Sequence, residues 1–214
     1  MDLKPDEFRS FRKGEGQILL IACGALAREI ITLIEVNDWH HLDVTCLPAK
    51  LHNEPKKIPD AVREKIHANR EKYNKIFVLY ADCGTGGLLD KVLAEEGVER
   101  IGGPHCYSFF SGVESFSKTS ETEITAFYLT DYLARHFNTL IWKGMGLDRH
   151  PELKPIYFAH YEKVVYLAQT EDEELVRLAK EAADMLELAY EYRFTGYGDL
   201  SSYMVAAAQG SQPL

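Results

Sequence analysis

The sequence predicts an α/β fold with an open, mostly parallel sheet and helices on both faces, a Rossmann-like three-layer arrangement in a single domain. Two observations predict it. Short uninterrupted apolar runs alternate with segments of helical periodicity, and such alternation joins neighbouring parallel strands by right-handed crossovers. The chain has 214 residues, of which 46% are apolar, and this is enough to bury one core without disulfides.

The first half of the chain supplies four predicted strands and three predicted helices. The strands are Gln17–Ala22, Asp43–Leu47, Lys75–Ala81 and Val98–Ile101, and the helices are Ala25–Val36, Pro59–Tyr73 and Leu88–Glu96. The first strand is an unbroken apolar run, as expected for a strand buried on both faces. Pro59 suits a first helical turn, and Gly97 suits the end of a helix.

The second half is predicted to continue this alternation. The expected helices are Thr125–Phe137 and Asp172–Glu187, and the expected strands are Thr139–Trp142, Lys163–Ala168 and Ala189–Phe194. We expect residues 1–15 to form a polar leader and residues 16–200 to form the α/β domain. Residues 201–214 are predicted to be a tail that frays or reaches a neighbouring subunit, so a homo-oligomer is an open alternative.

Composition excludes several classes of partner. The net charge of −9 argues against a surface for nucleic acid. No stretch approaches the twenty or so apolar residues of a membrane span, and the charged beginning of the chain has no secretory apolar core. Four cysteines without such a signal predict reduced thiols in the cytoplasm.

The four cysteines are the main candidates for chemistry. Each falls at or just past the predicted carboxyl end of one of the first four strands, namely Cys23, Cys46, Cys83 and Cys106. Ligands of open α/β sheets bind at this edge, so the thiolates are expected to hold a zinc ion or an iron–sulfur cluster. The lack of a Cys-x-x-Cys pair argues against a structural zinc site and for a catalytic or cofactor-holding one. The alternative is that each cysteine is a small buried hydrophobic residue.

A glycine-rich turn follows the third strand and contains the candidate cofactor-binding residues Gly84, Thr85, Gly86 and Gly87. Its backbone amides are expected to face an anion such as a phosphate, a carboxylate or a cluster sulfide, and to favour the thiolate form of Cys83. The turn has neither the lysine of a phosphate-binding loop nor the spacing of a dinucleotide-binding motif. A turn without any ligand is the alternative.

Three further residues are candidate catalytic groups. His105 precedes Cys106 on a turn fixed by Gly-Gly-Pro, and can act as a ligand, an acid–base group or a helix cap. His52 lies on a polar loop after Cys46, which either contacts substrate or is a simple turn. Arg149 is expected to clamp a carboxylate or phosphate, unless it only pairs with Asp148 to fix its loop.

The chain resembles the domain-of-unknown-function family numbered 1638. The stretches that carry the resemblance are Ala22–Ala25, Leu51–Asn53, Asp82–Gly87, Gly103–Tyr107, Leu129–Asp131, Gly146–Pro151 and Tyr166–Gln169. Genes of this family often lie near those of corrinoid-dependent methyltransferases in anaerobes and methylotrophs. The resemblance therefore implies a link to one-carbon or methylamine metabolism, which is an association and not a mechanism.

Three hypotheses follow for the function. In the first, the thiols hold a metal ion or cluster, and the protein is an enzyme or handles a cofactor, acting on a small anionic or methylated substrate. In the second, no metal is needed, because Cys83 is a nucleophile, His105 its base and the glycine amides an oxyanion site. In the third, the protein is a non-enzymatic accessory that binds a corrinoid protein or a methyltransferase.

Overall fold

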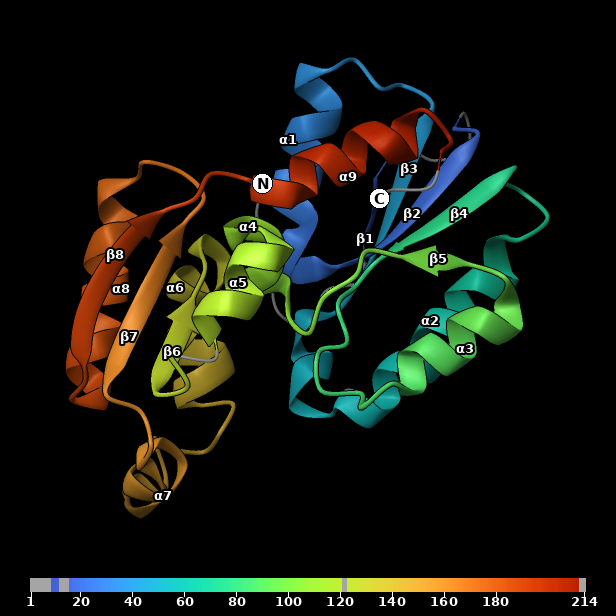
Figure 1. Ribbon diagram of the computed structural model, residues 1–214. Coiled ribbons are helices and arrows are strands. Elements are labelled where there is room, and N and C mark those ends of the chain that lie inside the picture. Colours follow the sequence, from blue (N-terminus) through green and yellow to red (C-terminus); the bar gives the residue numbers. More distant parts are fainter. Residues whose placement is uncertain (1–8, 12–15, 121–122, 212–214) are drawn as a thin grey trace. The chain divides into compact units, whose positions relative to one another are not determined.

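The computed structural model of the chain describes residues 9–11, 16–120 and 123–211 (Figure 1). Its contacts divide the chain into two compact units. Unit 1 comprises Met1–Cys106 and Asp199–Leu214, and unit 2 comprises Tyr107–Gly198. The α/β class with mostly parallel strands is confirmed, but the strands form two separate sheets instead of one.

The sheet of unit 1 has the strand order β1-β3-β2-β4-β5. Its strands are β1 (Arg9–Phe11), β2 (Ile18–Cys23), β3 (Leu42–Leu47), β4 (Lys75–Leu79) and β5 (Glu99–Arg100). Strand β2 pairs in parallel with both β3 and β4, whereas β1 pairs antiparallel with β3. The chain therefore moves from β2 to one side and returns to the other, which makes the carboxyl end of β2 a topological switch point.

Helices cover both faces of this sheet (Figure 1). Helices α1 (Ala27–Val36) and α9 (Gly198–Ala208) lie on one face, and α2 (Ile58–Asn69) and α3 (Leu88–Glu96) lie on the other. The apolar stripe that predicts the first helix is confirmed, because Ile30 and Ile34 are buried. Crossovers through α1, α2 and α3 join the parallel strands, and α9 adds a further covering helix.

The two ends of the chain differ from the predicted leader and tail. Residues 9–11 of the expected leader form β1, and residues 1–8 and 12–15 lie outside the described part. Most of the expected tail belongs to α9, which buries Leu200, Met204 and Ala207, and only residues 212–214 are not described. His41 also fixes the end of α9, because its Nε2 lies 2.8 Å from the carbonyl oxygen of Ala208. The three-to-four-residue spacing of the apolar side chains explains why this segment is a helix.

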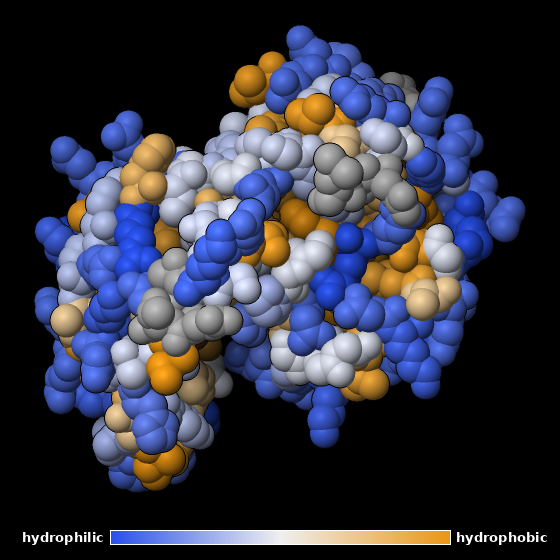
Figure 2. Space-filling model, viewed as in Figure 1, coloured by the Kyte–Doolittle hydropathy of each residue, from blue (hydrophilic) through white to orange (hydrophobic). Residues whose placement is uncertain are grey.

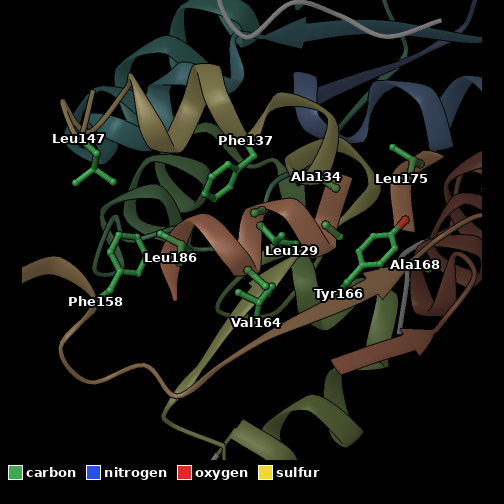
Figure 3. Packing of buried hydrophobic residues seen from close by; sticks show 13 residues of the cluster. Leu129, Ala134, Phe137, Leu147, Phe158, Val164, Tyr166, Ala168, Leu175 and Leu186 are labelled. Atoms are coloured by element: carbon green, nitrogen blue, oxygen red, sulfur yellow. The ribbon is translucent and has the colours of Figure 1, made fainter. Parts of the chain in front are cut away.

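Unit 2 contains a parallel three-stranded sheet in the order β6-β7-β8. Its elements are α5 (Val113–Ser120), β6 (Ala126–Leu129), α6 (Asp131–Phe137), α7 (Lys154–Phe158), β7 (Lys163–Ala168), α8 (Glu173–Leu186) and β8 (Ala189–Phe194), and α4 (Cys106–Ser111) precedes them. Figure 3 shows the main core, in which side chains such as Leu129 and Val164 of the sheet lie near Phe137 of α6 and Leu186 of α8. Phe116 of α5 packs against the other face.

Two predictions for unit 2 are wrong in their element type. Residues 126–129 form a strand, because alternate side chains enter different cores: Tyr128 packs with Phe116, whereas Phe127 packs with Phe158. Thr130 then caps α6 by accepting a hydrogen bond from the Leu133 amide at 3.3 Å. Asn138–Trp142, which overlaps an expected strand, is a π-helical turn that continues α6. Periodicity does not distinguish so short an apolar run from a helical one.

The surface bears no helix suited to crossing a bilayer. Hydrophilic residues dominate the face seen in Figure 2, and the hydrophobic ones lie among them. In the part of the chain that the structure describes, no helix combines the necessary length with the necessary apolar composition.

Candidate functional site

Cys23 occupies the switch point of unit 1. It is the last residue of β2, and its side chain is 2% exposed. The short helical turn Gly24–Leu26 begins directly after it, and the Ala25 amide donates a hydrogen bond to Cys23 Sγ at 3.4 Å. Negative charge on this sulfur is favoured, because unpaired amides at the start of a helical turn carry partial positive charge.

His52 reaches Cys23 from the turn Ala49–Asn53, which follows β3. Its Nδ1 lies 4.0 Å from Cys23 Sγ and 2.8 Å from the carbonyl oxygen of Ala49. A carbonyl oxygen only accepts hydrogen bonds, so Nδ1 carries a hydrogen. Nε2 is then the nitrogen that gains or loses a proton, and the Ala49 contact fixes the orientation of the ring.

Tyr80 completes the buried side of this site. The last pair between β2 and β4 joins Ala22 to Leu79, so the next residues, Cys23 and Tyr80, point to the same face of the sheet. The Tyr80 ring stacks on that of His52, with centroids 6.1 Å apart and planes inclined by 16°. Its hydroxyl group is fully buried and interacts with Cys23, and this interaction helps to lower the pKa of the Cys23 thiol.

Cys23 and His52 shift each other's pKa toward the charged forms, a thiolate and an imidazolium. Burial raises the pKa of the Cys23 thiol, but the charge of His52 and hydrogen bonds from His52 and the Ala25 amide outweigh it, so this pKa lies below its ordinary value. Burial lowers the pKa of His52, but the charge of Cys23 and interactions with Cys23 and Cys83 raise it well above its ordinary value. Each charged group thus stabilises the other in a site that excludes water.

Cys83 approaches the same imidazole from the loop after β4. Its side chain is 9% exposed, and its backbone has a positive φ of 49°, which non-glycine residues adopt only at a cost. Two backbone hydrogen bonds hold this conformation: the Asp82 amide donates to the Gly103 oxygen at 3.0 Å, and the Cys83 amide donates to the Pro104 oxygen at 2.9 Å. The loop is therefore fixed, with Cys83 beside His52.

The glycine-rich turn binds a carboxylate of its own chain. Asp82 accepts hydrogen bonds from the Thr85 hydroxyl at 2.6 Å, the Gly86 amide at 3.1 Å and the Gly87 amide at 2.8 Å. Burial raises the pKa of Asp82, but these hydrogen bonds bring it below its ordinary value. The two amides expected to face a phosphate or a cluster are thus occupied by Asp82, and Gly84, Gly86 and Gly87 supply the positive φ angles of the turn.

Cys46 and Cys106 differ from Cys23 in their surroundings. Cys46 pairs with Ala22 in the β2–β3 register, so its side chain points to the opposite face from Cys23. Burial and the charge of Cys23 raise the pKa of Cys46, which keeps it a neutral thiol. Cys106 is half-buried at the start of α4, and burial together with the charge of Cys83 raises its pKa.

The structure does not gather the four cysteines into a ready metal site. Across residues 9–11, 16–120 and 123–211, no group of three or more His, Cys, Asp or Glu side chains is arranged to hold a metal ion. The four thiols are all free, and all of them lie in unit 1. The closest pairing is instead between one thiol, Cys23, and one imidazole, His52.

The two remaining candidate catalytic residues are His105 and Arg149. His105 is exposed and lies near Asp82. Desolvation of its ring lowers the pKa of His105, and the negative charge of Asp82 offsets only part of this shift. Arg149 belongs to unit 2, where its exposed guanidinium lies 3.7 Å from the Asp148 carboxylate. This ion pair matches the alternative role for Arg149, in which it pairs with Asp148 to fix its own loop and does not bind a ligand.

Two residues were not predicted from the sequence. Tyr80 was placed inside a strand, and its position two residues before Asp82 was the available signal. Asp131 of unit 2 is 2% exposed and accepts hydrogen bonds from the Tyr166 hydroxyl at 2.7 Å, the Gln169 amide at 2.9 Å and the Thr170 hydroxyl at 2.6 Å. Its lone pairs are occupied, so Asp131 joins the start of α6 to the end of β7 as a structural group.

The comparisons with known proteins agree with the sequence resemblance. Residues 46–204 match the model of the family described as "Protein of unknown function (DUF1638)". The chain belongs to this family. The DUF1638 match includes His52, Cys83 and Asp131, and it begins at Cys46, so Cys23 precedes it.

No curated protein matches this DUF1638 chain. Among solved structures, the ornithine carbamoyltransferase from Pyrococcus furiosus is similar over 86% of this chain, with 12% sequence identity and a TM-score of 0.27. The chain spans 56% of the length of that protein. Likeness at this level carries no argument about function.

Proposed function

We propose that this DUF1638 protein is an enzyme whose reactive group is the thiolate of Cys23, with His52 as its acid–base partner. The observation that carries the proposal is the contact of 4.0 Å between Cys23 Sγ and His52 Nδ1 at the carboxyl end of the central strand. Perturbed ionisable pairs of this kind are typical of active sites. This proposal moves the expected nucleophile from Cys83 to Cys23 and the expected base from His105 to His52.

The chemistry follows from the two charges. A thiolate attacks an electrophilic centre with its own electron pair and forms a bond from sulfur to that centre. The leaving group departs with the electron pair of the broken bond and takes a proton from His52. The Tyr80 hydroxyl interacts with Cys23 and favours the thiolate before it attacks.

The site favours a small substrate. Cys23 is 2% exposed, so a large electrophile would not reach its sulfur without rearrangement. The imidazolium of His52 supports an anionic group on that substrate. We retain the predictions of a small anionic or methylated compound, of a cytoplasmic setting and of a link to corrinoid-dependent methyl metabolism, which rest on the cysteine content and on the family resemblance.

Metal or cluster binding is the second proposal for the same residues. Two thiols and an imidazole are a donor set that zinc accepts, and Cys23, Cys83 and His52 interact electrostatically at one edge of the sheet. They would hold zinc or an iron–sulfur cluster, and the metal would supply Lewis-acid or electron-transfer chemistry. Among the described residues no group of three such donors is arranged to hold a metal ion, so metal content has to be measured together with reactivity.

Thiol reactivity tests the main proposal. The chain is purified anaerobically, its metal content is measured, and the metal-free protein is treated with iodoacetamide over a range of pH. We expect rapid carboxamidomethylation of Cys23 at neutral pH, its loss in Cys23→Ser and its retention in Cys46→Ser. Alkylation of Cys23 that rises only near the ordinary thiol pKa would overturn the proposal. Stoichiometric zinc or iron that is lost in Cys23→Ser would favour the metal-binding function.

An accessory role predicts a different outcome. A protein that only docks on a corrinoid protein or a methyltransferase does not need an ionised thiol. In that case Cys23→Ser would keep full binding to the partner, measured by co-purification with the corrinoid protein from a methyl-group-using anaerobe. The Cys23–His52 contact favours the enzyme over this role.

A further inference from the structure

We propose that Cys23 and Cys83 form a reversible dithiol–disulfide pair, with a hydroperoxide as the oxidant. This inference rests on the proposed function, because Cys23 is the attacking sulfur in both. It adds an activity, two-electron reduction of a small peroxide, and it assigns a second sulfur to the site.

Strand topology brings the two sulfurs to one place. Strands β2 and β4 are hydrogen-bonded neighbours, so their carboxyl ends are about 4.8 Å apart. Cys23 ends β2, and Cys83 lies on the turn that leaves β4. Both thiols interact with the one imidazole of His52.

The other two cysteines are poorer partners for Cys23. Cys46 faces the opposite side of the sheet, because it is in register with Ala22 and not with Cys23. Cys106 begins α4 after the turn that includes Pro104, and it interacts more strongly with Cys83 than with Cys23. A disulfide needs Cα atoms about 4.4–6.8 Å apart. Cys83 lies four residues past the end of β4, so its turn has to bring it within this range of Cys23 when the disulfide forms.

Burial selects the oxidant and the order of events. Cys23 is 2% exposed and Cys83 is 9% exposed, so a molecule as small as hydrogen peroxide is the oxidant best able to reach Cys23. The more exposed Cys83 is then the sulfur that an external thiol attacks when the disulfide is reduced. The positive φ of Cys83 holds its loop in a strained conformation, as is common at functional sites.

The two steps balance in atoms and electrons. The Cys23 thiolate attacks one peroxide oxygen, the O–O bond breaks, and the leaving hydroxide takes the His52 proton to form water. This leaves Cys23 as a sulfenic acid. The Cys83 sulfur then attacks Cys23 Sγ, the S–O bond breaks, and the hydroxyl group leaves as water with the Cys83 proton. Two equivalents of an external thiol restore both cysteines and are themselves oxidised to a disulfide.

The experiment treats the reduced, metal-free full chain with stoichiometric hydrogen peroxide and maps the peptides without reduction. We expect a Cys23–Cys83 disulfide in the wild type, in Cys46→Ser and in Cys106→Ser. In Cys83→Ser we expect a Cys23 sulfenic acid that dimedone traps, and circular dichroism shows whether each variant is folded. The folded wild type alone is decisive if a variant fails to fold.

The outcomes separate this inference from the proposed function. Rapid iodoacetamide labelling of Cys23 together with a peroxide product other than the Cys23–Cys83 disulfide would overturn the inference alone. Slow labelling of Cys23 at neutral pH would overturn the proposed function. A Cys83–Cys106 disulfide with Cys23 unmodified would also overturn the inference, because it would show that Cys23 is not the reacting sulfur.

Discussion

The sulfur of Cys23 lies 4.0 Å from Nδ1 of His52, although 29 positions separate the two residues in the chain. Strand β2 positions the cysteine, and the turn after the neighbouring strand β3 positions the histidine. The ring cannot rotate freely, because Nδ1 also donates to the Ala49 carbonyl oxygen at 2.8 Å. The pair therefore depends on the parallel register of β2 and β3, which joins Cys23 to Leu47.

Replacing His52 tests the charge that stabilises the Cys23 thiolate. In His52→Asn, burial remains but the imidazolium is lost, so we expect the pKa of Cys23 to rise above its ordinary value. Each unit of pKa lowers the thiolate fraction about tenfold below that pKa, so iodoacetamide labelling of Cys23 at neutral pH slows at least about tenfold. His150→Asn, an exposed histidine of unit 2, is the control. Equal rates in the two variants would show that His52 does not activate Cys23.

Replacing Asp131 tests the polar core of unit 2. In Asp131→Asn, one carboxylate oxygen becomes an amide that donates, yet the Tyr166 hydroxyl, the Thr170 hydroxyl and two backbone amides all need acceptors there. We expect a loss of about 3 kcal/mol in the free energy of unfolding, because buried donors become unsatisfied. Urea denaturation followed by circular dichroism measures it. Asp148→Asn, at an exposed ion pair, should change stability by less than about 0.5 kcal/mol.

Replacing Glu123 tests an ion-pair network on the sheet of unit 2. Arg193 and Lys163 both bind the Glu123 carboxylate, and hydrogen bonding to Arg193 is the main cause that lowers its pKa to about 2. A carboxyl group whose pKa is depressed stabilises the fold above its ordinary value near 4.5 and loses this effect as the pH falls toward 2.

Glu123→Gln should therefore cost about 1–2 kcal/mol at neutral pH, after allowance for partial exposure, and the difference from the wild type should shrink in acid. Denaturant unfolding at several pH values measures both effects. Glu114→Gln, in a fully exposed pair with Lys118, is the matched control and should stay within about 0.5 kcal/mol of the wild type. If the stability difference between Glu123→Gln and the wild type grew as the pH falls, the depressed pKa of Glu123 would be contradicted.

Replacing Gly198 tests a close backbone approach within unit 2. Gly198 has a φ of +47°, and an added Cβ would lie 2.3 Å from the Phe110 carbonyl oxygen. We expect Gly198→Ala to destabilise the protein by more than about 2 kcal/mol, because backbone strain and a steric clash add. Gly210→Ala is the control: its φ is +65°, but no atom lies within 4 Å of the added carbon, so about 1 kcal/mol is expected. Similar midpoints of thermal unfolding would show that the backbone near Phe110 moves easily.

The fold class was predictable because the buried strands of unit 1 are unbroken apolar runs. Residues 75–79 form a strand inside the predicted range, residues 18–23 form one shifted by a single residue from the predicted 17–22, and α1 and α8 follow their apolar stripes. The strand at 126–129 was mistaken for a helix because its four residues are too short to show a period of two beyond doubt. The helix at 198–208 was mistaken for a tail because small alanines give only a weak stripe.

The site was predictable only in part. The cysteines, His52 and the glycine-rich turn were identified, because polar and reactive residues at strand ends indicate the ligand edge of an α/β sheet. The contact between Cys23 and His52 was not predicted, because the two residues are 29 positions apart and only folding brings them together. The role of Gly86 and Gly87 also changed, because the Asp82 side chain accepts from their amides.

The order of residues along the chain by itself determined which segments become strands, which edge of the unit 1 sheet carries the thiols, and that the charge is acidic. Tertiary structure alone decided which thiol has a lowered pKa, because the pKa of a buried group depends on the neighbours that folding brings within a few ångströms. Strand register placed Cys23 toward His52 and Tyr80 and turned Cys46 to the other face. A shift of one residue in the β2–β3 register would turn both cysteines to the same face, so the chemistry of this site is a property of strand pairing.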